Sequence, residues 1–170
     1  MDVAVYAAIA ATPTPSLDRA MSKLAEAADY SRLSIASAAV LALAGGQAGR
    51  RAAAQGLASV AVTSAVVNAL VKPLGRRHRP DREESEVPFA RHVPMPRSSS
   101  FPSGHSASAF AFATGVGHTM PRAAIPLRVL AALVAYSRVH TGVHYPGDVV
   151  VGSLVGSAVA QITARGLASS

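Results

Sequence analysis

Residues 52–71 read AAAQGLASVAVTSAVVNALV, a run of twenty residues without an Asp, Glu, Lys or Arg. Because an α-helix rises about 1.5 Å per residue, this stretch is long enough as a helix to cross a hydrocarbon core of about 30 Å. Three other stretches also lack charge: 33–49, 98–121 and 149–164. The sequence therefore predicts an all-α integral membrane protein.

We expect about five transmembrane helices, at residues 33–49, 52–71, 103–120, 123–139 and 148–165. The fourth carries Arg128, which has to face protein or extend to the interface. Ala, Gly, Ser and Val dominate these stretches, and small residues let helix backbones approach closely, so we expect a compact helical bundle. The alternative is an Ala-rich soluble helical protein, whose small core could hardly bury four charge-free stretches of this length.

The composition excludes several function classes. The 170 residues fit a single domain, and the absence of cysteine excludes disulfides, a thiolate nucleophile and a Cys-ligated metal. Lys and Arg outnumber Asp and Glu by 16 to 9, a net charge of +7 that suits nucleic acid, anionic lipid or a phosphorylated substrate. Trp is absent and only 5% of residues are aromatic, so base stacking has little support and we expect no nucleic-acid partner.

The N-terminal region, residues 1–31, predicts an amphipathic helix on the membrane surface. Thr14 and Pro15 are typical of an N-cap followed by the first helical residue. Apolar side chains then follow at spacings of four, three and four, at Leu17, Met21, Leu24 and Ala28. We expect this helix to pack on the bundle without a catalytic role. Residues 1–11 contain Asp2 and no basic residue, so we expect no cleaved signal peptide.

Three polar clusters stand at the ends of the expected helices: KPLGRRHRP at 72–80, PSGH at 102–105 and SRVHTGVHYPGD at 137–148. If successive helices alternate in direction, all three clusters meet at one membrane face. The polar stretch 72–102 is too long for a simple connection and predicts an active-site loop. Within it we interpret Arg76, Arg77 and Arg82 as a basic cluster that contacts anionic lipid.

The residue types in these clusters suit phosphoryl transfer. Pro102 fits the first turn of a helix, which leaves the amides of Ser103, Gly104 and His105 free to bind an anion. The Ser103 hydroxyl could add a further donor, and the glycine allows close approach. Lys72, Arg79 and Arg138 supply three cations, of which the arginines can bind phosphate oxygens in bidentate fashion.

Histidines complete the constellation. One imidazole could attack phosphorus and another could protonate the departing alkoxide, while Asp148 could hold the second nitrogen of the nucleophile. His140, His144 and Asp148, at intervals of four, could instead be metal ligands on one helical face. Pro146 and Gly147 interrupt any helix that would join His144 to Asp148, so we expect no metal and no other cofactor.

The pattern K-x6-R-P at 72–80, P-S-G-H at 102–105 and S-R-x5-H-x3-D at 137–148 resembles the complete three-part signature of the type 2 phosphatidic acid phosphatase (PAP2) superfamily. The resemblance implies a metal-independent lipid phosphatase. It implies that His144 is the nucleophile that forms a phosphohistidine, that Asp148 assists it, and that His105 is the general acid. It further implies that the phosphoryl group is bound by Lys72, Arg79, Ser103, Gly104 and Arg138.

We therefore expect residues 1–170 to form one multi-pass cell-membrane phosphatase domain that acts on a lipid phosphate. The Ala- and Arg-rich chain is similar to actinobacterial members, which implies a polyprenyl-linked substrate of cell-wall synthesis, best a decaprenyl-linked 5-phosphoribose. Undecaprenyl diphosphate, phosphatidic acid and phosphatidylglycerol phosphate are the alternatives. A noncatalytic lipid-phosphate carrier, from another functional class, would need the cations but neither histidine. The distribution of Lys and Arg favours an active site on the cytoplasmic face.

Overall fold

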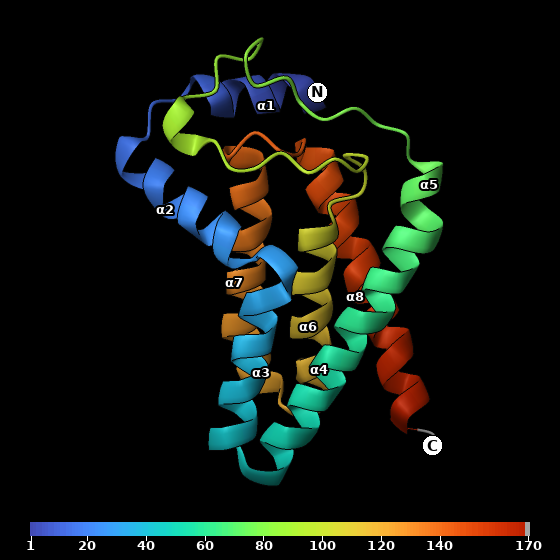
Figure 1. Ribbon diagram of the computed structural model, residues 1–170. Coiled ribbons are helices and arrows are strands. Elements are labelled where there is room, and N and C mark those ends of the chain that lie inside the picture. Colours follow the sequence, from blue (N-terminus) through green and yellow to red (C-terminus); the bar gives the residue numbers. More distant parts are fainter. Residues whose placement is uncertain (169–170) are drawn as a thin grey trace.

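The computed structural model describes residues 1–168, and within that range every regular element is a helix (Figure 1). The all-α bundle predicted from the charge-free stretches is thus confirmed. The α-helices are α1 (Asp2–Ala11), α2 (Pro15–Ala27), α3 (Arg32–Ala44), α4 (Gly46–Val66), α5 (Lys72–Leu74), α6 (Gly104–Thr119), α7 (Pro121–His140) and α8 (Pro146–Ala168). Short 3-10 turns lie at Asp29–Ser31 and Phe89–Arg91, and a π-helical turn, Val67–Val71, joins α4 to α5.

Helix α6 is the centre of the bundle, with α4, α7 and α8 packed around it. Small residues make this packing possible. On α4, a Cβ at Gly56 would meet the ring of Phe112, and on α8, a Cβ at Gly156 would collide with the backbone of Ala107. The abundance of Gly, Ala and Ser in the sequence therefore corresponds to close helix contacts, as expected.

Three segments of the described chain are long and apolar enough to cross a membrane: Gly46–Leu74, Pro121–His140 and Pro146–Gly166. They correspond to the second, fourth and fifth expected spans. Helix α3 has 13 residues and α6 has 16, fewer than the roughly 20 that a full crossing requires. The first expected span, 33–49, is shorter because the chain turns at Gly46, where φ is +59°, and the next helix begins before Arg50.

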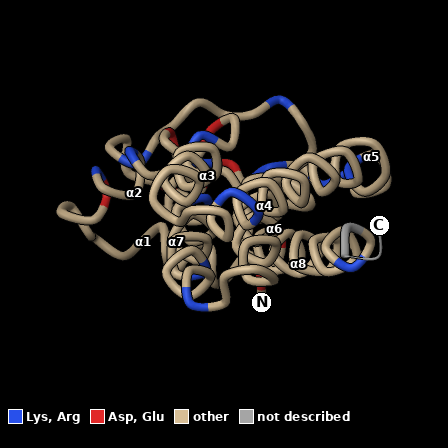
Figure 2. The backbone as a smooth tube through the Cα atoms, turned by 90° about the horizontal axis from the view of Figure 1, so that it is seen from below, with Lys and Arg blue, Asp and Glu red and all other residues tan. Residues whose placement is uncertain are grey.

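Helices α1 and α2 lie across one end of the bundle (Figure 1). Viewed along the bundle, long stretches of the helices carry no charged residue, whereas basic and acidic residues occur in the N-terminal region and at helix ends (Figure 2). Helix α2 begins at Pro15 with Thr14 as its N-cap residue, as predicted. The Thr14 hydroxyl, however, donates to the Asp18 carboxylate (2.8 Å) and caps no amide.

The buried face of α2 differs from the predicted one. It contains Asp18, Met21 and Ala25, whereas Leu17 and Leu24 of the predicted apolar face are only half-buried, and the acidic Asp18 is 5% exposed. Arg91 from the long loop is fully buried and donates to Asp18 (2.8 Å), while His140 of α7 lies 2.9 Å from the same carboxylate oxygen. This ion cluster, together with bonds from Arg91 to the carbonyls of residues 9, 10 and 12, fastens the N-terminal region to the bundle.

The three polar clusters converge at that end of the bundle, as the alternating helix directions predicted (Figure 1). The end of α5, the start of α6, the end of α7 and the start of α8 all lie there. Of the expected loop 72–102, the first three residues are still helical, and residues 75–102 form the connection proper.

Candidate active site

His144 lies in the turn between α7 and α8 and is 2% exposed. Its Nε2 atom is 3.2 Å from Nη1 of Arg79, and its Nδ1 atom is 3.5 Å from Oδ2 of Asp148. A guanidinium can only donate, so the facing Nε2 carries the lone pair and the proton resides on Nδ1, toward the carboxylate. This tautomer presents Nε2 as a nucleophile.

Burial lowers the pKa of His144, and the charges of Arg79 and Arg138 lower it further, against the opposing effect of Asp148. The resulting pKa is about 4. The imidazole is therefore neutral near pH 7, which is the form that can attack an electrophile.

Asp148 is fully buried in the first turn of α8, where every contact fixes its orientation. Oδ2 accepts hydrogen bonds from the Ser100 hydroxyl and from the Tyr145 amide (2.9 Å), and Oδ1 accepts one from Arg77 (3.0 Å). Ser100 was not predicted. The triplet Ser98–Ser100 next to the PSGH motif was the available signal for it.

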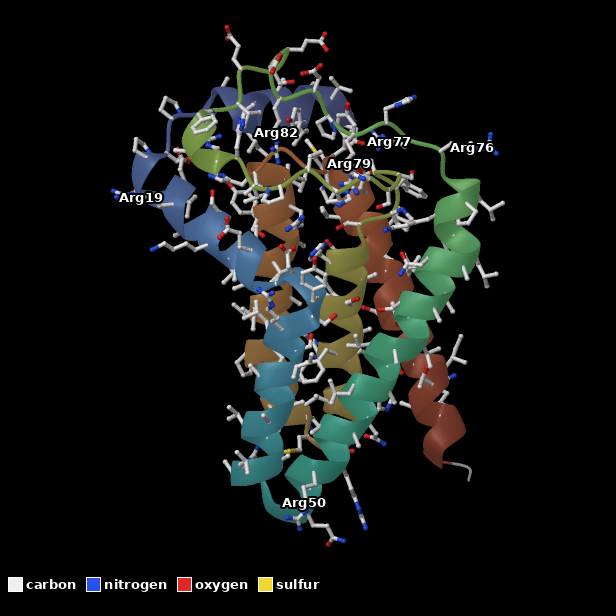
Figure 3. The ribbon with its side chains drawn as sticks, in the orientation of Figure 1. Arg19, Arg50, Arg76, Arg77, Arg79 and Arg82 are labelled. Atoms are coloured by element: carbon white, nitrogen blue, oxygen red, sulfur yellow. The ribbon has the colours of Figure 1, made fainter. Side chains whose placement is uncertain are left out.

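The contacts of Arg77 and Arg82 contradict the interpretation of the basic cluster as a lipid-contacting group. It pairs with Asp148 and with Asp2 (2.7 Å), and its guanidinium lies over the Tyr145 ring, 4.0 Å from the centroid. Arg82 also turns inward and donates to the carbonyl of Val93 (2.9 Å). In Figure 3, Arg76 points away from the bundle, as a lipid-contacting residue should, whereas Arg77 and Arg79 lie above the starts of α6 and α8.

Two predicted phosphate ligands, Lys72 and Arg79, meet at Ser98. The Lys72 ammonium donates to the Ser98 hydroxyl (3.2 Å), and Arg79 contacts the same hydroxyl (3.4 Å) and the Ser98 carbonyl (3.0 Å). A Cβ at Gly104 would lie 3.8 Å from the Lys72 nitrogen. The helix end, the loop and the PSGH motif therefore place two cations beside Gly104 and His144.

The start of α6 differs from the prediction in one respect. The helix begins at Gly104, after Pro102, and Ser103 is the N-cap residue. The Ser103 oxygen accepts from the amide (3.4 Å) and the hydroxyl (3.0 Å) of Ser106, and its own amide donates to the carbonyl of Asp148 (3.0 Å). Ser103 is fully buried, and the bond from its amide joins the start of α6 to α8, so this amide is not free to bind an anion. Its hydroxyl oxygen accepts both side-chain bonds, and donation from the hydroxyl to phosphate stays a prediction. Within residues 1–168, the amides of Gly104 and His105 remain without a protein acceptor.

His105 contacts an unexpected residue, Asp29, which lies between α2 and α3. Nε2 of His105 is 2.8 Å from Oδ1 of Asp29, and Nη1 of Arg138 is 3.8 Å from the same oxygen. Arg138 is 1% exposed and donates to the Ala25 carbonyl (3.2 Å), and its Nε has no hydrogen-bond partner in the described part of the chain. The N-terminal region, expected only to pack, thus contacts both residues.

The backbone around Asp29 explains how it reaches the site. Tyr30 and Ser31 both adopt left-handed conformations, with φ of 55° and 57°. Such conformations are disfavoured for residues other than glycine. This elbow ends α2 and redirects the chain into α3, which leaves Asp29 against His105.

His140, which the four-residue spacing grouped with His144 and Asp148, lies elsewhere. It pairs with Asp18 and contacts the Tyr136 hydroxyl (3.3 Å). Among the described residues, no group of three or more His, Cys, Asp or Glu side chains is arranged to hold a metal ion.

The chain is similar to several known proteins. The chain is 42% identical over 94 residues to decaprenylphosphoryl-5-phosphoribose phosphatase of Mycobacterium tuberculosis, which covers 55% of this chain and 49% of that protein. It is 32% identical over 111 residues to lipid A 1-phosphatase of Rhizobium etli, covering 62% and 46%. The chain thus spans about half the length of these relatives.

Two crystal structures share the fold. LpxE of Aquifex aeolicus superposes with a TM-score of 0.78 at 24% identity, covering 96% of this chain and 94% of that chain. The transmembrane PAP2 type phosphatidylglycerolphosphate phosphatase of Bacillus subtilis gives a TM-score of 0.70 at 25% identity, covering 99% and 84%.

The model of the PAP2 superfamily matches residues 52–168, well over half of the chain. That span contains every site residue predicted from the three motifs and leaves Asp29 outside it. The chain therefore belongs to the PAP2 superfamily.

Proposed function

We propose that this protein is a membrane lipid phosphatase that hydrolyses a phosphomonoester through a phosphohistidine on His144. The observation that carries the proposal is the state of that side chain: a neutral imidazole with Nε2 unprotonated and Nδ1 directed at a buried carboxylate, beside Arg79 and Lys72. A carrier that only bound lipid phosphate would need the cations but no oriented nucleophile.

In the proposed first step, Nε2 of His144 attacks phosphorus and the bond to the substrate's ester oxygen breaks. His105, whose Nε2 lies 2.8 Å from the Asp29 carboxylate, transfers a proton to the departing alkoxide. In the structure, Arg79 donates to Nε2 of His144. When substrate binds, phosphoryl oxygens would attract this guanidinium and leave the Nε2 lone pair free to attack. Asp148 stabilises the positive charge that develops on the imidazole.

In the second step, water attacks the phosphohistidine. His105 takes a proton from that water, the P–N bond breaks, and inorganic phosphate leaves with His144 restored. Lys72, Arg79, Arg138 and the free amides of Gly104 and His105 neutralise the phosphoryl charge in both steps. Ser103 holds the start of α6, and its hydroxyl is the proposed further donor to the phosphoryl group.

The proposed substrate is decaprenylphosphoryl-5-phosphoribose, the compound given in the name of the M. tuberculosis relative. The support is the 42% identity over 94 residues. A similarity to undecaprenyl-diphosphatase of Sulfolobus acidocaldarius, 43% identical over 65 residues, makes undecaprenyl diphosphate the main competitor.

Phosphate release by the purified protein tests the proposal. The panel contains decaprenylphosphoryl-5-phosphoribose, undecaprenyl diphosphate, phosphatidic acid and phosphatidylglycerol phosphate, each assayed in EDTA with His144→Ala as the control. Release from the decaprenyl substrate by the wild type alone is expected. Equal release by His144→Ala would refute the mechanism, and no release from any member would refute the enzymatic reading.

We assign the protein to the cell membrane with its active site on the cytoplasmic face. Arg19 lies toward the active-site end and Arg50 lies at the opposite end (Figure 3). The active-site end also carries the basic loop and Lys23 of α2, and the opposite end carries Arg51 of α4, Arg122 at the start of α7 and Arg165 near the end of α8. Topology reporters fused after Arg51 and after Arg97 test this assignment. A cytoplasmic signal from the Arg51 fusion and a periplasmic signal from the Arg97 fusion would reverse it.

A further inference from the structure

A cavity of about 210 Å³ lies beside His105, between α3, α4 and α6. Lys72, Gly104 and His105 line it, and so do residues further along the same faces of α4 and α6, such as Thr63 and Ser108. His144 is not among its lining residues. The cavity therefore extends from the general-acid side of the site into the bundle.

The lining of this cavity combines apolar side chains with several polar ones. Side chains with hydroxyl or amide groups come from five elements, namely the 3-10 turn before α3, α3 itself, α4, the π-helical turn and α6: Ser31, Ser34, Thr63, Ser64, Asn68 and Ser108. The hydroxyls of Ser64 and Ser108 approach each other across α4 and α6 at 3.4 Å. Since polar groups are costly in the hydrocarbon region, a polar lining indicates a polar occupant.

Two residues on α4 and its π-helical turn strengthen this reading. The Thr63 hydroxyl is buried and has no hydrogen-bond partner within residues 1–168, although buried hydroxyls are nearly always satisfied. Asn68 is exposed on the span Gly46–Leu74 and lies in the π-helical turn Val67–Val71, a deviation that often marks functional sites. The Asn68 amide nitrogen donates to the Ser64 carbonyl (2.9 Å), which leaves the Asn68 side-chain oxygen as an acceptor for a ligand hydroxyl. The Thr63 hydroxyl could bond to the same kind of ligand.

The position of the cavity identifies which part of the substrate it receives. In an in-line displacement, the nucleophile and the leaving oxygen stand on opposite sides of phosphorus. His144 is the proposed nucleophile, and His105, which lines the cavity, is the proposed acid that protonates the leaving oxygen. We infer that this cavity is the subsite for the leaving alcohol and that it binds a polyhydroxylated alcohol, such as a sugar, in preference to an acylglycerol. The inference rests on the proposed function.

The test compares two substrates whose leaving alcohols differ in hydroxyl content. Decaprenylphosphoryl-5-phosphoribose releases a lipid-linked ribose, whose leaving oxygen belongs to a sugar with further hydroxyls. Phosphatidic acid releases diacylglycerol, which has no other free hydroxyl. For each variant the readout is the ratio of the two kcat/KM values. Thr63→Val and Ser108→Ala should each lower this ratio about 2- to 10-fold, the effect of one lost hydrogen bond. Thr163→Val is the matched control, because its hydroxyl bonds to the Val159 carbonyl within α8, away from the cavity.

Binding separates failure of the subsite from failure of the enzymatic proposal. Both lipids are titrated into His144→Ala, with and without Thr63→Val, and the shift in Tm is measured. Tighter binding of the sugar-bearing lipid, reduced by Thr63→Val, would support the subsite even if no substrate were turned over. A substrate ratio that is the same in Thr63→Val and Thr163→Val, or a wild type that prefers phosphatidic acid, would overturn it.

Discussion

Replacing Asp148 with Asn removes the negative charge beside His144 while keeping the shape of the side chain. The Tyr145 amide and the Ser100 hydroxyl both donate to Oδ2, so the oxygen of the new amide is expected to keep that position. The amide nitrogen of the new side chain then replaces Oδ1 and faces Arg77, so Arg77 loses the acceptor of its hydrogen bond to residue 148. The tautomer of His144 should therefore survive, and the main loss is electrostatic.

The magnitude follows from the distance. Oδ2 lies 3.5 Å from Nδ1 of His144, and two unit charges at that separation interact by about 5 kcal/mol at an effective dielectric constant of about 20. Because the imidazole becomes positive only as the P–N bond forms, this attraction stabilises the transition state more than the ground state. Asp148→Asn should therefore reduce the rate of phosphoenzyme formation about 10³- to 10⁴-fold.

Rapid-quench measurement of phosphohistidine formation with an activated aryl phosphate checks this value, because the leaving group then needs little protonation. Asp2→Asn is the matched control: its carboxylate also pairs with Arg77 but is not among the contacts of His144. The control should lose less than about tenfold, the scale of a partly exposed ion pair. A comparable rate for both variants would refute the role given to Asp148.

Four further outcomes are expected. His105→Ala should lose less activity than His144→Ala on an activated aryl phosphate but nearly as much on a lipid phosphate, and equal losses on both substrates would reject the division of roles. A pKa of about 4 keeps the His144 imidazole almost wholly neutral near pH 7, so an NMR titration should show it becoming charged only as the pH falls toward 4; a midpoint near the ordinary 6.5 would contradict the burial argument. Phosphate release should persist in EDTA, and loss of turnover that magnesium restores would assign the charge neutralisation to a metal. Arg91→Met leaves Asp18 buried without its cation and should lower the free energy of unfolding by about 3–5 kcal/mol in a denaturant titration, whereas a change below about 1 kcal/mol would show that the cluster does not hold the N-terminal region.

The bundle and most of the site could be predicted because their signals are local or periodic. Charge-free stretches predicted the helices, and short motifs at helix ends predicted the convergence of Lys72, Arg79, His105, His144 and Asp148. Helix boundaries were less predictable. Residues 33–49 contain no charge, and only the positive φ of Gly46 shows where one helix stops and the next begins.

The misassigned residues share a different cause. The Ser103 amide was expected to be free to bind an anion, but it donates to the Asp148 carbonyl, because the use of that amide depends on where α6 begins and on the neighbouring α8 backbone. Arg76, Arg77 and Arg79 all lie in the same basic motif, so the sequence does not distinguish the one that faces Asp148 from the one that faces lipid. One of them faces Asp148 because the chain between α5 and α6 passes over the start of α8.

The sequence by itself determined the class of protein, the number of charge-free stretches and the residues able to transfer a phosphoryl group, because hydropathy and residue chemistry are properties of the chain at each position. Only the tertiary structure decided which groups meet. Asp29 and His105 are 76 residues apart, and Asp18 and His140 are 122 apart, and no pattern within either segment specifies the other. Those contacts depend on the left-handed elbow at residues 30–31 and on the docking of the N-terminal helices, which are set by the packing of the whole bundle.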